Sequence, residues 1–263
     1  MPSEKKYYAK KHLGQHFLIN PRIKQRILDT CQLRPDDVVL EIGPGAGALT
    51  LDIAQRVRRL YAVEKDPVLY AVLKAKLPLK KIRLFQADFL TFDLRKLTAL
   101  TKIIGNLPYN IASPILAKLL EKPERPVPVF VMLQYEFAKR IAAQPHTKDY
   151  GPLSCFVQYF SRPKILFHIK PAAFQPKPKV MSSFVCLEPR IHKPQSQDVK
   201  YLMRIIHQAF QQRRKTIANA LNPLITKNKS VAVFAWLDIN PNDRPEDLSL
   251  VDYVLISNLM RKL

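Results

Sequence analysis

The feature that most limits the possible folds of this chain is a glycine-rich turn between a strand pattern and a helix pattern. The apolar run Val38–Ile42 leads into Gly43-Pro-Gly-Ala-Gly47, and apolar residues at helical spacing continue to Arg56. Glycine tolerates left-handed backbone angles and lets the main chain approach a ligand closely. A strand, a glycine turn and a helix in this order indicate an α/β sheet with a ligand site at the turn.

Short β-branched runs alternate with helical patterns through the first two thirds of the chain, which is typical of a doubly wound α/β sheet. Helices are predicted at 46–56, 67–77, 113–121 and 135–143. Seven strands are predicted, at 38–42, 60–63, 82–86, 102–105, 127–133, 165–169 and 183–187. No clear helical pattern separates the last two strands, so we expect them to form a hairpin at one edge.

The composition changes after Arg190, where a polar segment is followed only by helical patterns, at 201–212, 215–221, 231–237 and 250–263. We therefore predict two domains. Residues 1–192 form the α/β domain with a basic N-terminal arm, and residues 193–263 form a small helical domain.

Charge, cysteine usage and hydropathy narrow the class of protein. Lys and Arg outnumber Asp and Glu by 43 to 21 in 263 residues, a net charge of +22 that favours a nucleic acid partner, although such basicity can also serve solubility alone. Cys31, Cys155 and Cys186 are widely spaced, which supports neither a disulfide framework nor a metal site. No apolar run is long enough to cross a membrane. We expect a cytoplasmic protein.

The acidic residues around the turn indicate which cofactor it serves. Glu41 stands two positions before Gly43, and the spacing Gly-x-Gly-x-Gly through Gly45 differs from the dinucleotide fingerprint, so S-adenosylmethionine is favoured over NAD. Glu64 ends the second strand, where a carboxylate can accept both ribose hydroxyls, although Glu64 also suits the start of a helix.

Asp88 ends the third strand and can accept the exocyclic N–H of the cofactor adenine, with Phe89 or Leu90 covering the ring. A loop-capping aspartate is the alternative interpretation. Both assignments put acidic side chains at the carboxyl ends of neighbouring strands.

The segment Asn106-Leu-Pro-Tyr109 follows the fourth strand and predicts the reacting-group site. An adenine N6 amino group is a poor nucleophile because its lone pair is delocalised into the ring. The side-chain oxygen of Asn106 and the main-chain oxygen of Leu107 can accept both of its hydrogens and free that pair. Pro108 fixes the backbone, and Tyr109 offers a face on which an extruded base can stack.

These motifs resemble those of the adenine N6,N6-dimethyltransferases of ribosomal RNA, most closely the bacterial small-subunit branch. Besides the segments above, the resemblance rests on Lys11-His-Leu-Gly-Gln-His-Phe-Leu18, Phe174-Gln-Pro-Lys-Pro-Lys-Val-Met-Ser182 and Phe210-Gln-Gln-Arg-Arg-Lys-Thr-Ile-Ala-Asn219. It implies a class I methyltransferase fold and, as substrate, two adjacent adenosines in the 3′-terminal hairpin loop of small-subunit (16S) rRNA, on an immature ribosomal subunit.

The resemblance also implies roles for individual residues. His16, which replaces an Asn often found there, and Leu18 would line the methionine end of the cofactor. Asn106 would lie where cofactor and target base meet, and Phe174 would sandwich the base opposite Tyr109, unless it is a core aromatic.

Two basic clusters are candidates for contact with RNA phosphates: Lys5, Lys6, Lys10 and Lys11 in the N-terminal arm, and Arg213, Arg214 and Lys215 before a C-terminal helix. We therefore expect the helical domain at 193–263 to contribute to RNA binding. Either cluster can also be a solvated charged surface.

Three other functions are alternatives for a chain with these motifs. A macrolide-resistance methyltransferase performs the same chemistry on large-subunit rRNA, and a non-catalytic RNA-binding assembly factor can retain the same fold. An NAD oxidoreductase would leave Asn106–Tyr109 unexplained. We expect a monomer.

Overall fold

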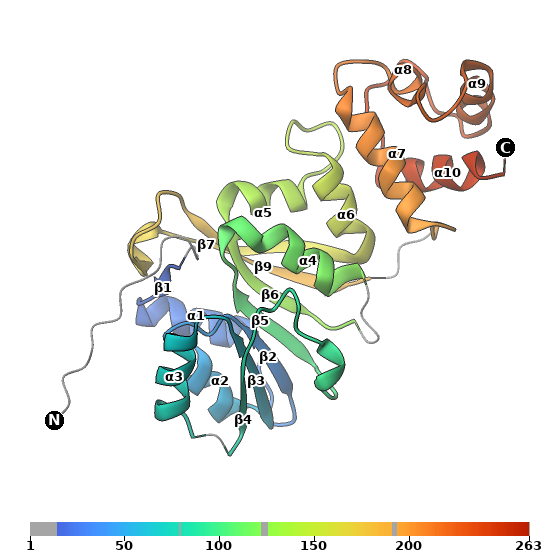
Figure 1. Cartoon of the computed structure of the whole chain (residues 1–263). Coiled ribbons are helices and arrows are strands. Elements are labelled where there is room, and N and C mark those ends of the chain that lie inside the picture. The colour runs from blue at the N-terminus through green and yellow to red at the C-terminus, as the bar shows by residue number, and fades with distance from the viewer. Residues whose placement is uncertain (1–14, 79, 122–125, 191–193, 263) are drawn as a thin grey trace. The chain divides into compact units, whose positions relative to one another are not determined.

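The computed structural model describes residues 15–78, 80–121, 126–190 and 194–262, without the side chains of residues 109, 227 and 228. Figure 1 shows the order of its elements along the chain. The strands are β1 (Phe17–Leu18), β2 (Val38–Ile42), β3 (Arg59–Glu64), β4 (Ile82–Gln86), β5 (Lys102–Asn106), β6 (Val129–Gln134), β7 (Ser161–Ile169), β8 (Phe174–Gln175) and β9 (Ser182–Pro189). The α-helices are α1 (Pro21–Thr30), α2 (Thr50–Arg56), α3 (Pro67–Lys76), α4 (Ala112–Glu121), α5 (Tyr135–Ala142), α6 (Pro152–Phe160), α7 (Val199–Gln211), α8 (Ile217–Leu221), α9 (Lys227–Trp236) and α10 (Leu250–Met260).

A seven-stranded sheet forms the centre of the fold, in the order β4-β3-β2-β5-β6-β9-β7. The first five strands in this order are parallel, β9 runs antiparallel to β6, and β7 is the neighbour of β9. This confirms the predicted α/β sheet and the pairing of its last two strands. The carboxyl ends of the five parallel strands share one edge, which is where ligands bind in such sheets.

The central strands are buried on both faces, which explains their near-continuous apolar sequences. All residues of β2 are buried. Residues from α1 and α2, such as Ile27 and Ile53, form one core cluster with Val39 and Ile104 of the sheet. The start of α1 is set locally, because Asn20 accepts a hydrogen bond from the Ile23 amide at 3.1 Å and a proline occupies the first turn.

Several elements differ from the sequence predictions. Helix α2 begins at Thr50 instead of residue 46, because the turn before it includes left-handed glycines. Helices α1 and α6 were not predicted. A second, two-stranded sheet joins β1 to β8, far away in sequence, with Phe17 opposite Gln175 and Leu18 opposite Phe174.

The described chain divides into two compact units, one ending at Tyr135 with Lys164–Glu188 added, the other made of Glu136–Pro163 and Pro189–Leu263. In the second unit, α6 packs with α7 and α10 around a core that includes Tyr150, Ile205 and Tyr253. Gln158 on α6 also donates hydrogen bonds to the carbonyls of Ile141 in α5 and of Ala143 directly after it. The single boundary near residue 193 therefore differs from this division, because composition does not register that packing.

No helix within the described residues is long and apolar enough to span a membrane.

Candidate active site

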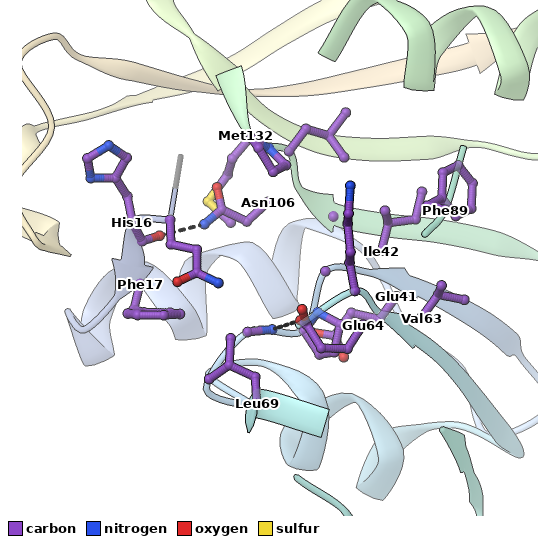
Figure 2. Close-up of a pocket in the computed structure, with 18 of the residues that line it drawn as sticks. His16, Phe17, Glu41, Ile42, Val63, Glu64, Leu69, Phe89, Asn106 and Met132 are labelled. Carbon is purple, nitrogen blue, oxygen red and sulfur yellow. Dashed lines mark hydrogen bonds between the residues drawn. The ribbon is translucent and has the colours of Figure 1, made fainter. Parts of the chain in front are cut away.

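A cavity opens at the carboxyl ends of β2, β3 and β5 (Figure 2). This is the edge at which the sequence placed its glycine turn and acidic residues. The lining residues are Gln15, His16, Phe17, Leu18, Glu41, Ile42, Gly43, Pro44, Gly45, Ala46, Ala48, Leu49, Val63, Glu64, Lys65, Leu69, Ala87, Asp88, Phe89, Gly105, Asn106, Leu107, Pro108, Asn110, Ile111, Ile115 and Met132. The site residues predicted from β2 to β5 are therefore brought together.

The glycine turn has the backbone that its sequence requires. Gly43, Gly45 and Gly47 have φ angles of +65°, +61° and +83°, all in the left-handed region. A Cβ atom at Gly47 would lie 2.9 Å from the Leu73 side chain, and one at Gly45 would lie 3.2 Å from the Phe17 ring. The turn thus packs between α3 and the N-terminal strand, with its backbone on the cavity wall.

Glu64 braces this turn from the end of β3. One carboxylate oxygen accepts the Gly45 amide at 3.0 Å and the other accepts the Asp66 amide at 2.8 Å. The side chain is buried, and that burial raises the pKa of the carboxyl group despite these hydrogen bonds. Each carboxylate oxygen keeps a further lone pair with which it can accept from a ligand hydroxyl.

Glu41 is a second buried carboxyl group in the cavity wall. Its Oε2 atom has no hydrogen-bond partner among the described residues. Burial raises its pKa to about 8, with a smaller contribution from the charge of Glu64. At neutral pH it is therefore mostly protonated, and it can donate as well as accept a hydrogen bond.

Asp88 lies beyond β4 and is partly neutralised. Its Oδ2 forms an ion pair with the Lys65 ammonium at 2.8 Å, while Oδ1 accepts the Leu90 amide at 2.9 Å. The Lys65 hydrogen bond, followed by the Leu90 amide, lowers the pKa of Asp88. Phe89 is buried and lines the cavity beside it, whereas Leu90 is not among the lining residues.

Asn106 has a defined amide orientation at the end of β5. Its Nδ2 donates to the main-chain carbonyl of His16 at 2.9 Å, as Figure 2 shows. An amide whose nitrogen is held in this way presents its oxygen on the other side. Leu107 is buried and lines the cavity, Pro108 has an extended backbone, and Tyr109 begins a short 3-10 helix, but the Tyr109 side chain lies outside the described part.

His16 lines the cavity, as the resemblance implies, but mainly through its backbone, and the role of Phe174 requires correction. The His16 ring points away from Asn106 in Figure 2, and its Nδ1 lies 2.7 Å from the Pro176 carbonyl, so the His16 backbone faces the reacting amide. Phe174 is 3% exposed and packs in the core cluster of the first unit, because its pairing with Leu18 turns it inward. It offers no face to a target base in this structure. Leu18 also lines the cavity.

Several lining residues were not singled out from the sequence as site residues, and Gln15, Phe17 and Lys65 are among them. The first two lie within the N-terminal motif that carried part of the resemblance. Lys65 directly follows Glu64, and only its ion pair with Asp88 identifies it.

The basic clusters have different outcomes. Lys5, Lys6, Lys10 and Lys11 lie outside the described residues. Arg213 pairs with Glu246 at 3.0 Å and donates to the Thr147 carbonyl at 3.2 Å. Its guanidinium group is therefore paired within the second unit. Arg214 and Lys215 are exposed.

The cavity suits S-adenosylmethionine by its chemistry. A buried carboxyl atom without a partner at Glu41, a buried carboxylate at Glu64 and apolar walls at Ile42 and Phe89 match a ligand with hydroxyl, ammonium and aromatic parts. Across the described residues, no group of three or more His, Cys, Asp or Glu side chains is placed to hold a metal ion.

Comparison with known proteins agrees with this geometry. A family model described as ribosomal RNA adenine dimethylase matches residues 7–262. The ribosomal RNA small subunit methyltransferase A of Aromatoleum aromaticum is 40% identical over 251 residues, 95% of this chain and 93% of that protein.

Two solved structures share the fold. A dimethyladenosine transferase from Plasmodium falciparum has a TM-score of 0.79 at 22% identity, covering 92% of this chain and 96% of that one. The 23S rRNA methyltransferase ErmE has a TM-score of 0.70 at 25% identity, covering 93% and 99%. These similarities extend over both compact units, so the fold is that of a class I methyltransferase with a helical C-terminal region. The chain belongs to the ribosomal RNA adenine dimethylase family and is an rRNA adenine dimethyltransferase that uses S-adenosylmethionine.

Proposed function

We propose that this enzyme dimethylates N6 of two adjacent adenosines in the 3′-terminal hairpin loop of small-subunit rRNA, four methyl transfers in total. The observation that carries the proposal is the Asn106 amide, held at 2.9 Å by the His16 carbonyl so that its oxygen is free to accept. The relative from Aromatoleum aromaticum is named for the small ribosomal subunit. That supports this subunit over the other.

The chemistry follows from the two acceptors at the end of β5. The Asn106 side-chain oxygen and the Leu107 carbonyl accept the two hydrogens of the adenine amino group, which favours a pyramidal nitrogen with its lone pair available. When bound, S-adenosylmethionine supplies a methyl group on an activated sulfonium. No strong general base is required, because the nitrogen loses its proton only after it has become positively charged, to an acceptor or to water.

The other residues hold the cofactor and base in place. The turn at Gly43 and Gly45 carries the methionine end, Glu64 accepts the ribose hydroxyls, and Asp88 accepts the adenine amino group. Asp88 can do so with a remaining lone pair while Lys65 stays paired with it. Tyr109 is the proposed stacking face for the target base.

A methyltransferase of large-subunit rRNA can have this same fold, because the 23S rRNA methyltransferase ErmE has it. The segments Phe174-Gln-Pro-Lys-Pro-Lys-Val-Met-Ser182 and Phe210-Gln-Gln-Arg-Arg-Lys-Thr-Ile-Ala-Asn219 resemble the small-subunit branch and favour that substrate. A non-catalytic assembly factor would not need the acceptor geometry at Asn106. Calorimetry measures whether the chain binds S-adenosylmethionine, which separates an enzyme from a non-catalytic assembly factor.

We further propose that the enzyme acts as a cytoplasmic monomer on an immature ribosomal small subunit, with the C-terminal helices contributing to RNA binding. The net charge of +22 supports binding to a polyanion such as RNA.

Replacing Asn106 with Ala tests the mechanism. We expect transfer to fall by at least about 10²-fold, the usual cost of losing one oriented polar group at a reacting centre, while the Kd for S-adenosylmethionine changes little. Mass spectrometry of dimethyladenosine in reacted small-subunit RNA measures the first quantity, and calorimetry measures the second.

Asn222, an exposed asparagine in the second unit, gives the matched control, and Asn222→Ala should retain full activity. Dimethyladenosine formation at the normal rate by the Asn106→Ala enzyme would refute the mechanism. Modification of large-subunit RNA alone would refute the proposed substrate.

A further inference from the structure

An N-terminal strap, residues 15–20, connects the cavity to the segment that precedes β9. Its strand β1 pairs with β8, and the Ile19 amide donates to the Ala173 carbonyl at 2.9 Å. On its other side the strap lines the cavity through Gln15 to Leu18. The strap therefore touches both the reacting-group site and the residues around β8.

His16 makes both connections within one residue. Its main-chain carbonyl accepts the Asn106 amide at 2.9 Å, and its ring Nδ1 lies 2.7 Å from the Pro176 carbonyl. A carbonyl oxygen only accepts, so Nδ1 must carry the hydrogen and donate it. The ring thus ties the strap to Pro176 while the backbone orients the amide.

The orientation of Asn106 matters because its two ends have opposite hydrogen-bonding character. With Nδ2 on the His16 carbonyl, Oδ1 accepts from an incoming amino group. If the carbonyl moves away, rotation of the amide by half a turn costs little and presents N–H groups to the N–H groups of the substrate. That orientation repels the substrate.

The loop beyond Pro176 is open to a large partner. Lys177 and Lys179 are exposed, and Val180 and Met181 are 42% and 39% exposed. Cations beside exposed apolar side chains suit an RNA surface with phosphates and unpaired bases. Lys177 directly follows Pro176, so RNA bound at this lysine contacts the chain one residue from the carbonyl to which the His16 ring donates.

We propose that His16 is a positioning residue: its ring anchors the strap on Pro176, so that its carbonyl keeps Asn106 in the accepting orientation and methyl transfer depends on where the RNA-facing loop sits. The proposal rests on the proposed role of Asn106. It assigns the ring of His16 to the loop and not to the cofactor.

A matched pair of variants isolates the ring's hydrogen bond. His16→Gln keeps an N–H donor, and His16→Leu keeps a comparable volume without one. We expect His16→Leu to lower the single-turnover rate on unmethylated small ribosomal particles by about 10-fold, as for one lost hydrogen bond, with the Kd for S-adenosylmethionine within about 2-fold. His16→Gln should recover most of the rate. His207→Ala, at an exposed histidine on α7, should behave as wild type.

Equal rates for His16→Leu and wild type would overturn the proposal. So would a rise in the cofactor Kd as large as the fall in rate, because the ring would then serve the cofactor. If either result occurs while the Asn106→Ala enzyme is inactive, only the role of His16 fails; if Asn106→Ala is active, the proposed function itself fails. NMR of the Asn106 side-chain amide gives a second readout in any folded variant, since His16→Leu should shift that resonance and His16→Gln should not.

Discussion

At the scale of single residues, Glu41 is the group with the largest electrostatic cost in the cavity wall. It is 3% exposed, lies near the charge of Glu64, and has a carboxyl pKa raised to about 8 from 4.5. Such a group binds its proton more tightly in the folded chain than in the unfolded chain. The contribution of this group to the free energy of unfolding is therefore fully present below about pH 4.5 and is lost as the pH rises toward 8.

Glu41→Gln removes this titration, because an amide does not ionise. We compare the free energies of unfolding of wild type and variant at each pH. Their difference, wild type minus variant, should fall by a few kcal/mol between pH 5 and pH 8, at about 1.4 kcal/mol per pH unit. Urea unfolding of the cofactor-free proteins across this range measures the difference. Parallel stability curves would show that Glu41 is ionised in the fold.

Residues were predicted well where a strand end fixes them and poorly where a distant pairing fixes them. Gly45, Glu64 and Asn106 follow apolar strands, and parallel strands align their carboxyl ends, so their meeting follows from local patterns. The burial of Phe174 and the direction of the His16 ring depend on β1 pairing with β8, which no local pattern announces.

At the scale of elements, the turn between β2 and α2 has backbone angles that only glycine adopts easily. Gly47 has a φ of +83°, and a Cβ atom added there would lie 2.9 Å from the side chain of Leu73 in α3. The helix pattern in the sequence ran through this turn because apolar spacing does not report the sign of φ. The same limitation explains the late start of α2.

Gly47→Ala should lower the free energy of unfolding by about 1–3 kcal/mol, from the left-handed backbone and the contact with Leu73, and should weaken binding of S-adenosylmethionine. Gly151→Ala is the matched control, since Gly151 is extended and a Cβ there would lie 3.9 Å from Phe210, an ordinary contact. Urea titration and calorimetry measure the two effects. Equal stability of the two variants would contradict the assignment.

At the scale of the whole molecule, the charge of +22 gives long-range attraction to RNA, but local contacts decide which charges bind. Sequence alone treated residues 213 to 215 as one cluster. The structure separates Arg213, paired with Glu246, from the exposed Arg214 and Lys215. The difference comes from a partner more than thirty residues away in sequence, which composition cannot identify.

Reversing both exposed charges, with Arg214→Glu and Lys215→Glu together, should weaken RNA binding and make its salt dependence shallower, because fewer counterions are released. Arg213→Glu should instead lower the melting temperature. The control pair Lys74→Glu and Lys76→Glu on α3 changes the net charge equally. Affinities measured over a salt series would contradict the assignment if both pairs of variants gave the same loss.

The position of β9 between β6 and β7 sets the earliest moment at which a newly made chain can close its sheet. β7 leaves the exit tunnel before β9, yet it has no neighbour in the sheet until residues 182–189 have emerged and inserted beside it. For that interval, two strand edges wait unpaired during translation, and unpaired edges favour aggregation. The nascent polypeptide is thus most exposed to misassembly, and to chaperone binding, during synthesis of these roughly twenty residues.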